Sequence, residues 1–161
     1  MLSYKLVHLI QYHSDRLTAG LLSQVERTKR AESYANVSPT ELKERVSDIY
    51  SHLGAWLVDK SETDIEERYI AIGARRAAQN VPLSELVWVI VLTKNTLREY
   101  INDVSSPGRA ADVSEKDELL QRLDIFFDHA IHAAVVGYER AVTAKIVTAK
   151  VKARRVMRKA S

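Results

Sequence analysis

The sequence predicts an all-α protein: a single globin-like or bundle-like domain of about five helices with a long C-terminal helix. Apolar residues recur at intervals of three and four along nearly the whole chain, which is the spacing of one face of an α-helix. Only five glycines and three prolines occur in 161 residues, too few for the many turns of a β-sandwich or barrel. Because 46% of the residues are hydrophobic, the chain is apolar enough to fold around a core.

The first two helices are predicted from apolar spacing and one capping signal. Apolar residues at helical intervals indicate a helix from about Ser3 to about Arg30, and residues 32–37 form the expected loop. The sequence Ser-Pro-Thr-Glu at residues 38–41 places a serine at the N-cap, a proline at the first helical position and a glutamate at the third. These residues make a capping box, so the second helix is predicted to begin there and to end near Lys60.

The next two helices are separated by a short break. Residues 61–64 offer another N-cap, and the helical period continues to about Gln79, where two residues break it before Pro82. The following apolar run, residues 86–92, has the composition of a buried strand, but the helical period continues without a breaker to Val104. We therefore predict one helix of about 22 residues, placed centrally because it is apolar on all sides.

The last helix is predicted to be longer than the body it packs on. The loop lies at residues 105–113, and a capping pair in residues 114–117 begins a helix that continues to about Arg158. At 1.5 Å per residue that helix is roughly 68 Å long, about twice the width of a small domain. The expected domains are therefore a helical sensory or regulatory domain, residues 1–139, and a basic helical extension, residues 140–161.

The net charge of +3 conceals a strong asymmetry. Residues 140–161 contain eight basic and no acidic residues, which leaves residues 1–139 with a net charge of −5. The basic residues of the extension are Arg140, Lys145, Lys150, Lys152, Arg154, Arg155, Arg158 and Lys159. An acidic body thus carries a basic tail.

The extension also has an apolar seam. The seam residues are Val142, Ile146, Ala149, Ala153 and Val156. Their spacing of four, three, four and three is that of a coiled coil, which predicts an output helix that pairs with its copy in a homodimer. The alternatives are a frayed basic tail, since chain termini are often loose, and the truncated end of a longer protein.

The residue content argues against an enzyme. Without cysteine there is no disulfide, thiolate zinc site, iron–sulfur cluster or cysteine nucleophile, and the chain suits a reducing compartment. The sequence contains no Gly-rich phosphate loop, GxSxG, HExxH or kinase signature. The N-terminus lacks the pattern of a signal peptide, and the longest apolar stretch is too short to span a membrane. We expect a non-enzymatic, cytoplasmic protein with no cofactor and no transmembrane segment.

A metal site has one candidate cluster. Asp124, Asp128 and His132 follow one another at intervals of four and share a helix face, as ligands would. No matching histidine or glutamate motif is present on another predicted helix, so a solvated or interface-facing polar stripe is the favoured interpretation. Haem binding remains an alternative for an apolar helical protein with five histidines.

A ligand pocket has three candidate residues. Arg76, Trp88 and Tyr138 lie on or beside the apolar stripes of three predicted helices, and together they could line a pocket for a small anionic ligand. The alternative is core packing, with the arginine paired to a glutamate: Glu66, Glu67 or Glu139.

The basic tail also suggests nucleic-acid binding, because its cations could contact phosphates. However, the tail has no aromatic residue for base stacking, and its lysines and arginines point to several sides of a helix. A nucleic-acid-binding adaptor therefore stays an alternative that these features weigh against. An acidic protein partner or an anionic membrane surface is an equal alternative.

Two short motifs in residues 63–88, TDIEERYIAIGARRAAQNVPLSELVW, resemble the N-terminal domain of the RsbRD type. The motifs are G-x-x-R-A and P-L-S-E-L, in that order. Ile-Phe-Phe-Asp at residues 125–128 and Gly-Tyr-Glu at residues 137–139 are similar to the last helix of the same domain. Such domains are found on RsbT co-antagonist proteins of the bacterial stressosome and on some histidine kinases and diguanylate cyclases. The resemblance covers most of residues 1–140.

The resemblance implies an all-helical sensory or regulatory module, similar to a globin fold without haem, usually dimeric and joined to an output domain through its C-terminal helix. It assigns no functional residue. No STAS, kinase or cyclase domain follows residue 140, which fits either a free-standing member or a fragment. We therefore predict a signal-sensing or regulatory interaction module of a bacterial stress system. Its expected partners are a second copy, a signalling protein and, in one interpretation, a small molecule.

Overall fold

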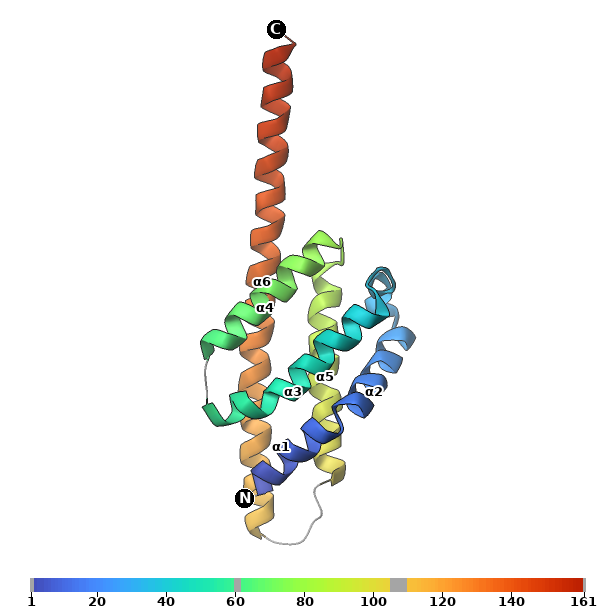
Figure 1. The fold of residues 1–161 in the computed structure, drawn as a ribbon, viewed down its shortest axis with the longest axis vertical. Coiled ribbons are helices and arrows are strands. Elements are labelled where there is room, and N and C mark those ends of the chain that lie inside the picture. Colours follow the sequence, from blue (N-terminus) through green and yellow to red (C-terminus); the bar gives the residue numbers. More distant parts are fainter. Residues whose placement is uncertain (1, 60–61, 105–109, 161) are drawn as a thin grey trace.

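The computed structural model describes residues 2–59, 62–104 and 110–160. These residues form six α-helices and one 3₁₀-helix, and no strand. In chain order the elements are α1 (Leu2–Tyr12), α2 (Ser14–Arg27), η1 (Lys29–Asn36), α3 (Pro39–Asp59), α4 (Glu62–Ala78), α5 (Leu83–Val104) and α6 (Ala110–Lys159). Figure 1 shows α1 to α5 beside the first half of α6, whose second half continues alone beyond the body. The prediction of an all-α fold with a long C-terminal helix is confirmed.

The N-terminal region is more broken than apolar spacing predicts. The single helix expected over residues 3–30 is two helices that meet at His13, and the second one ends at Arg27. At the junction His13 has φ −99° and ψ 17°. In the first turn of α2 the Thr18 hydroxyl donates a hydrogen bond to the carbonyl oxygen of Ser14 at 2.7 Å, a contact that often bends helices.

The segment expected as a loop forms a 3₁₀-helix instead. Thr28 has extended backbone angles, φ −90° and ψ 127°, which end α2, and its hydroxyl accepts a hydrogen bond from the Arg30 N–H. η1 packs against α5, where the Ser33 N–H and hydroxyl donate to the Glu85 carboxylate at 2.8 and 3.0 Å. This contact joins residues 52 positions apart, so local sequence does not reveal it.

The start of α3 follows its capping signal. The helix begins at Pro39, and the Glu41 N–H lies 3.5 Å from the Ser38 hydroxyl, as in an N-cap. The Glu41 carboxylate is directed across to α4, where it has other partners. The second predicted cap, at residues 61–64, begins outside the described residues.

The end of α4 also follows the sequence. Asn80 adopts a positive φ of 58°, and its N–H donates to the carbonyl oxygen of Ala77 while the next N–H, that of Val81, donates to the carbonyl oxygen of Arg76. This is a Schellman cap, in which asparagine tolerates the left-handed conformation. Beyond it, the apolar run that could have been a strand is helical, as predicted.

α6 begins earlier than predicted. Its first residue is Ala110, so the capping pair assigned to residues 114–117 lies inside the helix and that prediction is wrong. The early start has a local reason: residues 110 and 111 are alanines, which have the highest helix propensity, and residues 110–113 include no proline or glycine. The observed end, Lys159, lies one residue beyond the predicted one. Residues 105–109 of the predicted loop lie outside the described residues.

α4 and α6 make the most extensive helix contact of the body and approach closely at two glycines. A Cβ atom added at Gly73 of α4 would lie 2.0 Å from the carbonyl oxygen of Ala134. One added at Gly137 of α6 would lie 2.1 Å from the carbonyl oxygen of Ile70. Only residues without a side chain fit at this crossing, which fixes α6 against the rest of the body.

Candidate functional site

The most exposed candidate is the extension, the part of α6 beyond the body, of which the structure describes residues 140–160. α6 passes into it without a break, and every residue from Val142 to Ala160 is exposed. The exposed fractions of its apolar seam residues are 37% at Val142, 51% at Ile146 and 68% at Val156. Contiguous apolar side chains left in water indicate a surface for a partner.

The seam lies on a face without charge. At about 100° per residue, the five predicted seam residues fall within a sector roughly 80° wide. Every basic residue of the extension lies outside that sector. Lys145 and Lys152 lie along one of its edges and Lys150 along the other. The extension is therefore amphipathic, with a narrow apolar face between basic borders.

A shallow groove lies where the extension leaves the body. Its lining comes from the end of α4 and from α6: Ala77, Ala78, Ala141, Ala144, Lys145, Thr148, Ala149 and Lys152. Because these residues are mostly small, the groove leaves room beside the first turns of the extension. It also joins the end of α4 to the seam.

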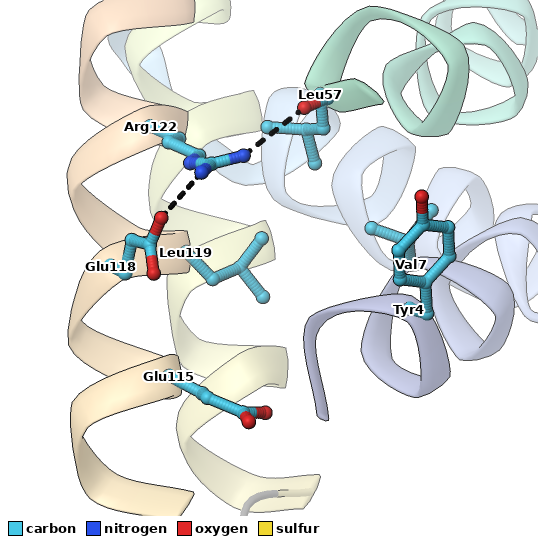
Figure 2. Close-up of a pocket in the computed structure, with 7 residues that line it drawn as sticks. All are labelled: Tyr4, Val7, Leu57, Glu115, Glu118, Leu119 and Arg122. Carbon is cyan, nitrogen blue, oxygen red and sulfur yellow. Dashed lines mark hydrogen bonds and ion pairs between the residues drawn. The ribbon is translucent and has the colours of Figure 1, made fainter. Parts of the chain in front are cut away.

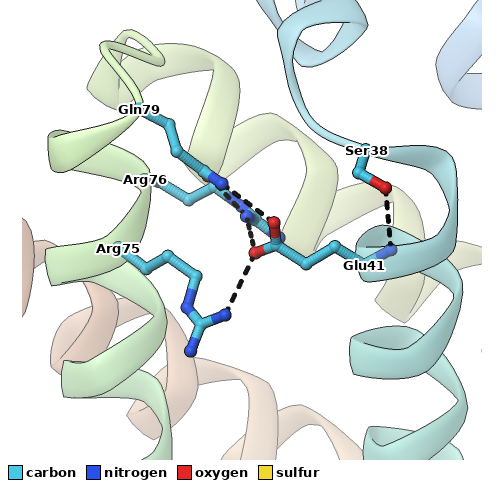
Figure 3. Close-up of polar contacts among 5 residues, drawn as sticks. All are labelled: Ser38, Glu41, Arg75, Arg76 and Gln79. Atoms are coloured by element: carbon cyan, nitrogen blue, oxygen red, sulfur yellow. Dashed lines mark hydrogen bonds and ion pairs between the residues drawn. The ribbon is translucent and has the colours of Figure 1, made fainter.

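Arg76 is held in a buried polar cluster between α4 and α3 (Figure 3). Its guanidinium donates to the Glu41 carboxylate at 3.0 Å and to the side-chain oxygen of Gln79 at 2.7 Å, and the Gln79 amide donates to Glu41 at 2.9 Å. Arg76 is 2% exposed. Arg75 reaches the same carboxylate at 3.4 Å, but its side chain is 47% exposed. The partner of Arg76 is therefore Glu41, and not one of the glutamates considered from sequence.

The cluster lowers the pKa of Glu41, and Arg76 also lies beside Tyr34. Burial alone would raise the pKa of Glu41, but hydrogen bonds from Arg76 and Gln79, the Arg76 charge and a hydrogen bond from Arg75 outweigh it and lower the pKa. The Arg76 guanidinium also lies 5.5 Å from the centroid of the Tyr34 ring. Burial raises the pKa of Tyr34 to about 12, although Arg76 opposes that effect. One guanidinium nitrogen of Arg76 thus contacts both Glu41 and Gln79 within the protein.

The other two pocket candidates have different neighbours. The Tyr138 hydroxyl donates to the carbonyl oxygen of Val81 at 2.7 Å, and the Val81 N–H donates to the carbonyl oxygen of Arg76 at 3.0 Å. Val81 therefore connects Arg76 and Tyr138. The Arg30 guanidinium lies 4.6 Å from the Trp88 ring centroid, and among the described residues the Trp88 indole N–H has no hydrogen-bond partner. That Arg76, Trp88 and Tyr138 together line a ligand pocket stays a prediction.

Asp124 of the candidate metal site is bound by Arg98 of α5. Both of its carboxylate oxygens accept hydrogen bonds from Arg98 at 2.7 Å. Asp128 and His132 are exposed on the next turns of α6. Within the described ranges, no three histidine, aspartate or glutamate side chains come together in a way that could hold a metal ion.

A small cavity that sequence reasoning did not identify lies between α1, the end of α3 and the first turns of α6 (Figure 2). Its lining residues are Tyr4, Val7, Leu57, Glu115, Glu118, Leu119 and Arg122. Arg122 spans one side, because its guanidinium donates to the Leu57 carbonyl oxygen at 3.3 Å and pairs with Glu118. The volume of about 150 Å³ is that of a cavity for a molecule the size of benzene. Three elements far apart in sequence form it, so no local pattern indicates it.

The comparison with known families finds a domain that covers most of the chain. The chain matches the RsbT co-antagonist protein rsbRD N-terminal domain over residues 14–149. No curated protein and no solved structure matches it. None of the helices in the described ranges is both long and apolar enough to cross a membrane. Because the match runs from the start of α2 into the extension, the chain belongs to the family of the RsbT co-antagonist protein rsbRD N-terminal domain.

Proposed function

We propose that this protein is a non-enzymatic regulatory module of a bacterial stress or signal-transduction system, acting in the cytoplasm as a homodimer that transmits a signal through its C-terminal helix. Family membership supports the stress-signalling role. The observation that carries the rest is the continuity of α6, whose inner face is buried within the body and which continues beyond the body, exposed from Val142 onward, without a break.

α6 is suited to connect the body with a partner. Within the body its Leu123, Phe127 and Ala130 are fully buried, and the glycine crossing sets its position against α4. Beyond the body it continues as a helix of about 20 residues, roughly 30 Å long. A ligand or partner that binds one position of α6 more tightly than another shifts the population toward that position. The extension then carries the shift outward.

The proposal predicts a dimer that depends on the seam. Replacing Val142 and Ile146 together by glutamate puts two charges into the uncharged sector, and we expect the dimer to become a monomer in light scattering. Both side chains are already largely exposed, 37% and 51%, so the thermal unfolding midpoint of the body should change little.

A matched control lies on the same helix. Val147 and Val151 are exposed to a similar degree, 56% and 46%, but lie about 140° and 180° around the helix from Val142. The variant Val147→Glu with Val151→Glu is expected to remain a dimer. Wild-type protein that is monomeric, or a seam variant that still dimerises, would contradict the proposal.

A further inference from the structure

A pocket of about 350 Å³ lies between the end of α2, η1 and the start of α3. These three elements follow one another along the chain and meet at one end of the body (Figure 1). The volume falls in the lower part of the range for sites that bind small molecules. The pocket therefore has room for a small organic ligand.

The interior of the pocket is apolar and buried. Its walls include Val25, Ala31, Val37 and Leu42, whose exposed fractions are 6%, 3%, 2% and 6%. The side chain of Tyr34, which is 4% exposed, adds an aromatic surface. Such walls bind the apolar part of a ligand, because its contact with them removes apolar surface from water.

The mouth of the pocket is negatively charged. Glu26 of α2 and Glu32 of η1 belong to its lining and are both exposed. Within the described ranges, neither carboxylate has a hydrogen bond or an ion pair. No lysine or arginine is among the described residues that line the pocket, and the Arg30 guanidinium of η1 lies instead 4.6 Å from the Trp88 ring centroid. Two unpaired negative charges thus lie beside an apolar interior.

We propose that this pocket binds a small organic cation, an amine whose apolar part lies inside the pocket and whose ammonium group lies at the two carboxylates. The ammonium group supplies the positive charge that Glu26 and Glu32 lack. Because both glutamates are exposed, the ammonium group keeps water on its outer side and avoids the cost of a buried charge. The same two charges repel an organic acid. The site therefore differs in place and in charge preference from the pocket predicted from Arg76, Trp88 and Tyr138.

The aromatic wall of the pocket is connected to α6. The Arg76 guanidinium lies 5.5 Å from the centroid of the Tyr34 ring. The carbonyl oxygen of Arg76 accepts a hydrogen bond from the Val81 N–H, and the carbonyl oxygen of Val81 accepts one from the Tyr138 hydroxyl of α6. A ligand that favours one position of the Tyr34 ring over another therefore acts on α6 just before the extension. This effect on α6 rests on the proposed function, whereas the binding site does not.

NMR titration of the full chain with 2-phenylethylamine tests the binding site. This probe has an apolar ring and an amine that is protonated at neutral pH. We expect saturable chemical-shift changes at the backbone amides of Val25, Ala31 and Val37. The uncharged analogue 2-phenylethanol should bind about tenfold more weakly, since two partly solvated ion pairs together contribute about that factor. Phenylacetate, which is negatively charged, should bind more weakly still.

Two double variants with the same change in net charge separate the pocket from general electrostatic attraction. Glu26→Gln with Glu32→Gln should weaken the binding of 2-phenylethylamine about tenfold and leave that of 2-phenylethanol unchanged. Glu66→Gln with Glu67→Gln replaces two glutamates of α4 that are also exposed and do not line the pocket. This control should leave the affinity for 2-phenylethylamine unchanged. Because all four positions are exposed, we expect both variants to fold.

Tyr138→Phe tests the connection to α6. In the wild type, the chemical-shift changes at saturation should extend from the pocket to the amides of residues 138–150. The variant lacks the hydroxyl that donates to the Val81 carbonyl oxygen. Its changes should therefore stop before α6, while its Kd for 2-phenylethylamine stays the same.

The outcomes separate the site, its connection to α6 and the proposed function. Equal affinities for 2-phenylethylamine and 2-phenylethanol, or equal affinities of the wild type and the Glu26 and Glu32 variant, overturn the organic-cation site. Tighter binding of a tripeptide with a central lysine also overturns it, because the pocket then takes a side chain of a partner protein. Shift changes confined to the pocket overturn only the connection to α6. None of these results bears on the dimer, which the variant of Val142 and Ile146 tests separately.

Discussion

Replacing Gly73 by alanine is expected to lower the free energy of unfolding by about 3 kcal/mol, the upper part of the range for an overpacked core. The added methyl carbon would lie 2.0 Å from the carbonyl oxygen of Ala134 and 2.9 Å from the backbone nitrogen of Tyr138. Backbone atoms cannot rotate away as a side chain can, so α4 and α6 would have to separate. At a helical glycine with free space around it, replacement by alanine has the opposite effect and raises the free energy of unfolding by about 1 kcal/mol.

Gly137 offers a second test of the close crossing, and Gly20 offers a control. Gly137→Ala is expected to destabilise similarly, because its added carbon would lie 2.1 Å from the carbonyl oxygen of Ile70 and 2.7 Å from the Ile70 Cα. Gly20 of α2 is exposed, and nothing lies within 4 Å of a Cβ added there. Gly20→Ala should therefore raise stability by up to about 1 kcal/mol. Urea unfolding followed by circular dichroism measures all three, and equal stabilities for Gly73→Ala and Gly20→Ala would contradict the close crossing.

The glycine crossing also bears on signal transmission. Since it allows α4 and α6 to approach at backbone distance, it determines where α6 lies relative to α4. A variant such as Gly73→Ala that still folds should hold α6 in a different position. It should therefore alter the proposed output of the extension even though residue 73 lies outside the seam.

The sequence predicted those elements whose boundaries depend on neighbouring residues. Ser38 caps α3, and Asn80 ends α4 in a left-handed conformation. Both signals act over four or five residues. The apolar run of α5 was assigned correctly because its helical period continued beyond the run. By contrast, the 3₁₀-helix η1 is held by the contact of Ser33 with Glu85, which only the tertiary fold creates.

The functional residues also divide into those that local spacing identifies and those that only the tertiary fold reveals. The seam is a periodic feature of one helix, so spacing alone identifies which residues share its face. The partner of Arg76 could not be identified in this way, because Glu41 lies 35 positions earlier in the chain. Gly73 was visible within a family motif, but its role follows from the backbone of α6, which no pattern within α4 contains.

Glu41→Gln is expected to lower the free energy of unfolding by about 2 to 3 kcal/mol, at or just below the lower end of the range for breaking a buried ion pair. The Arg76 side chain is 3% exposed, so the substitution leaves a buried positive charge with only neutral acceptors. The Glu41 side chain is 22% exposed, and water near it limits the loss. Urea unfolding at neutral pH measures the effect.

Two further variants test whether the buried charge is the cause. Arg75 contacts the same carboxylate oxygen from a side chain that is 47% exposed, and Arg75→Gln should cost less than about 1 kcal/mol. Adding Arg76→Met to Glu41→Gln removes the unpaired charge, so the double variant should be more stable than the sum of the two single losses predicts. Equal losses for Arg75→Gln and Glu41→Gln would show that burial of Arg76 does not decide the result.

Acid should reduce the difference between the wild type and Glu41→Gln. The pKa of Glu41 is lowered in the folded state from its ordinary value of 4.5, so the folded protein binds this proton less readily than the unfolded chain does. The stabilising contribution of the carboxylate is therefore complete above pH 4.5 and is lost as the pH falls through the lower pKa of the folded state. The glutamine side chain of the variant does not titrate, and the stability difference should shrink as the pH falls from about 7 to about 3. A difference that stays constant over that range would mean that Glu41 does not stabilise the fold through its charge.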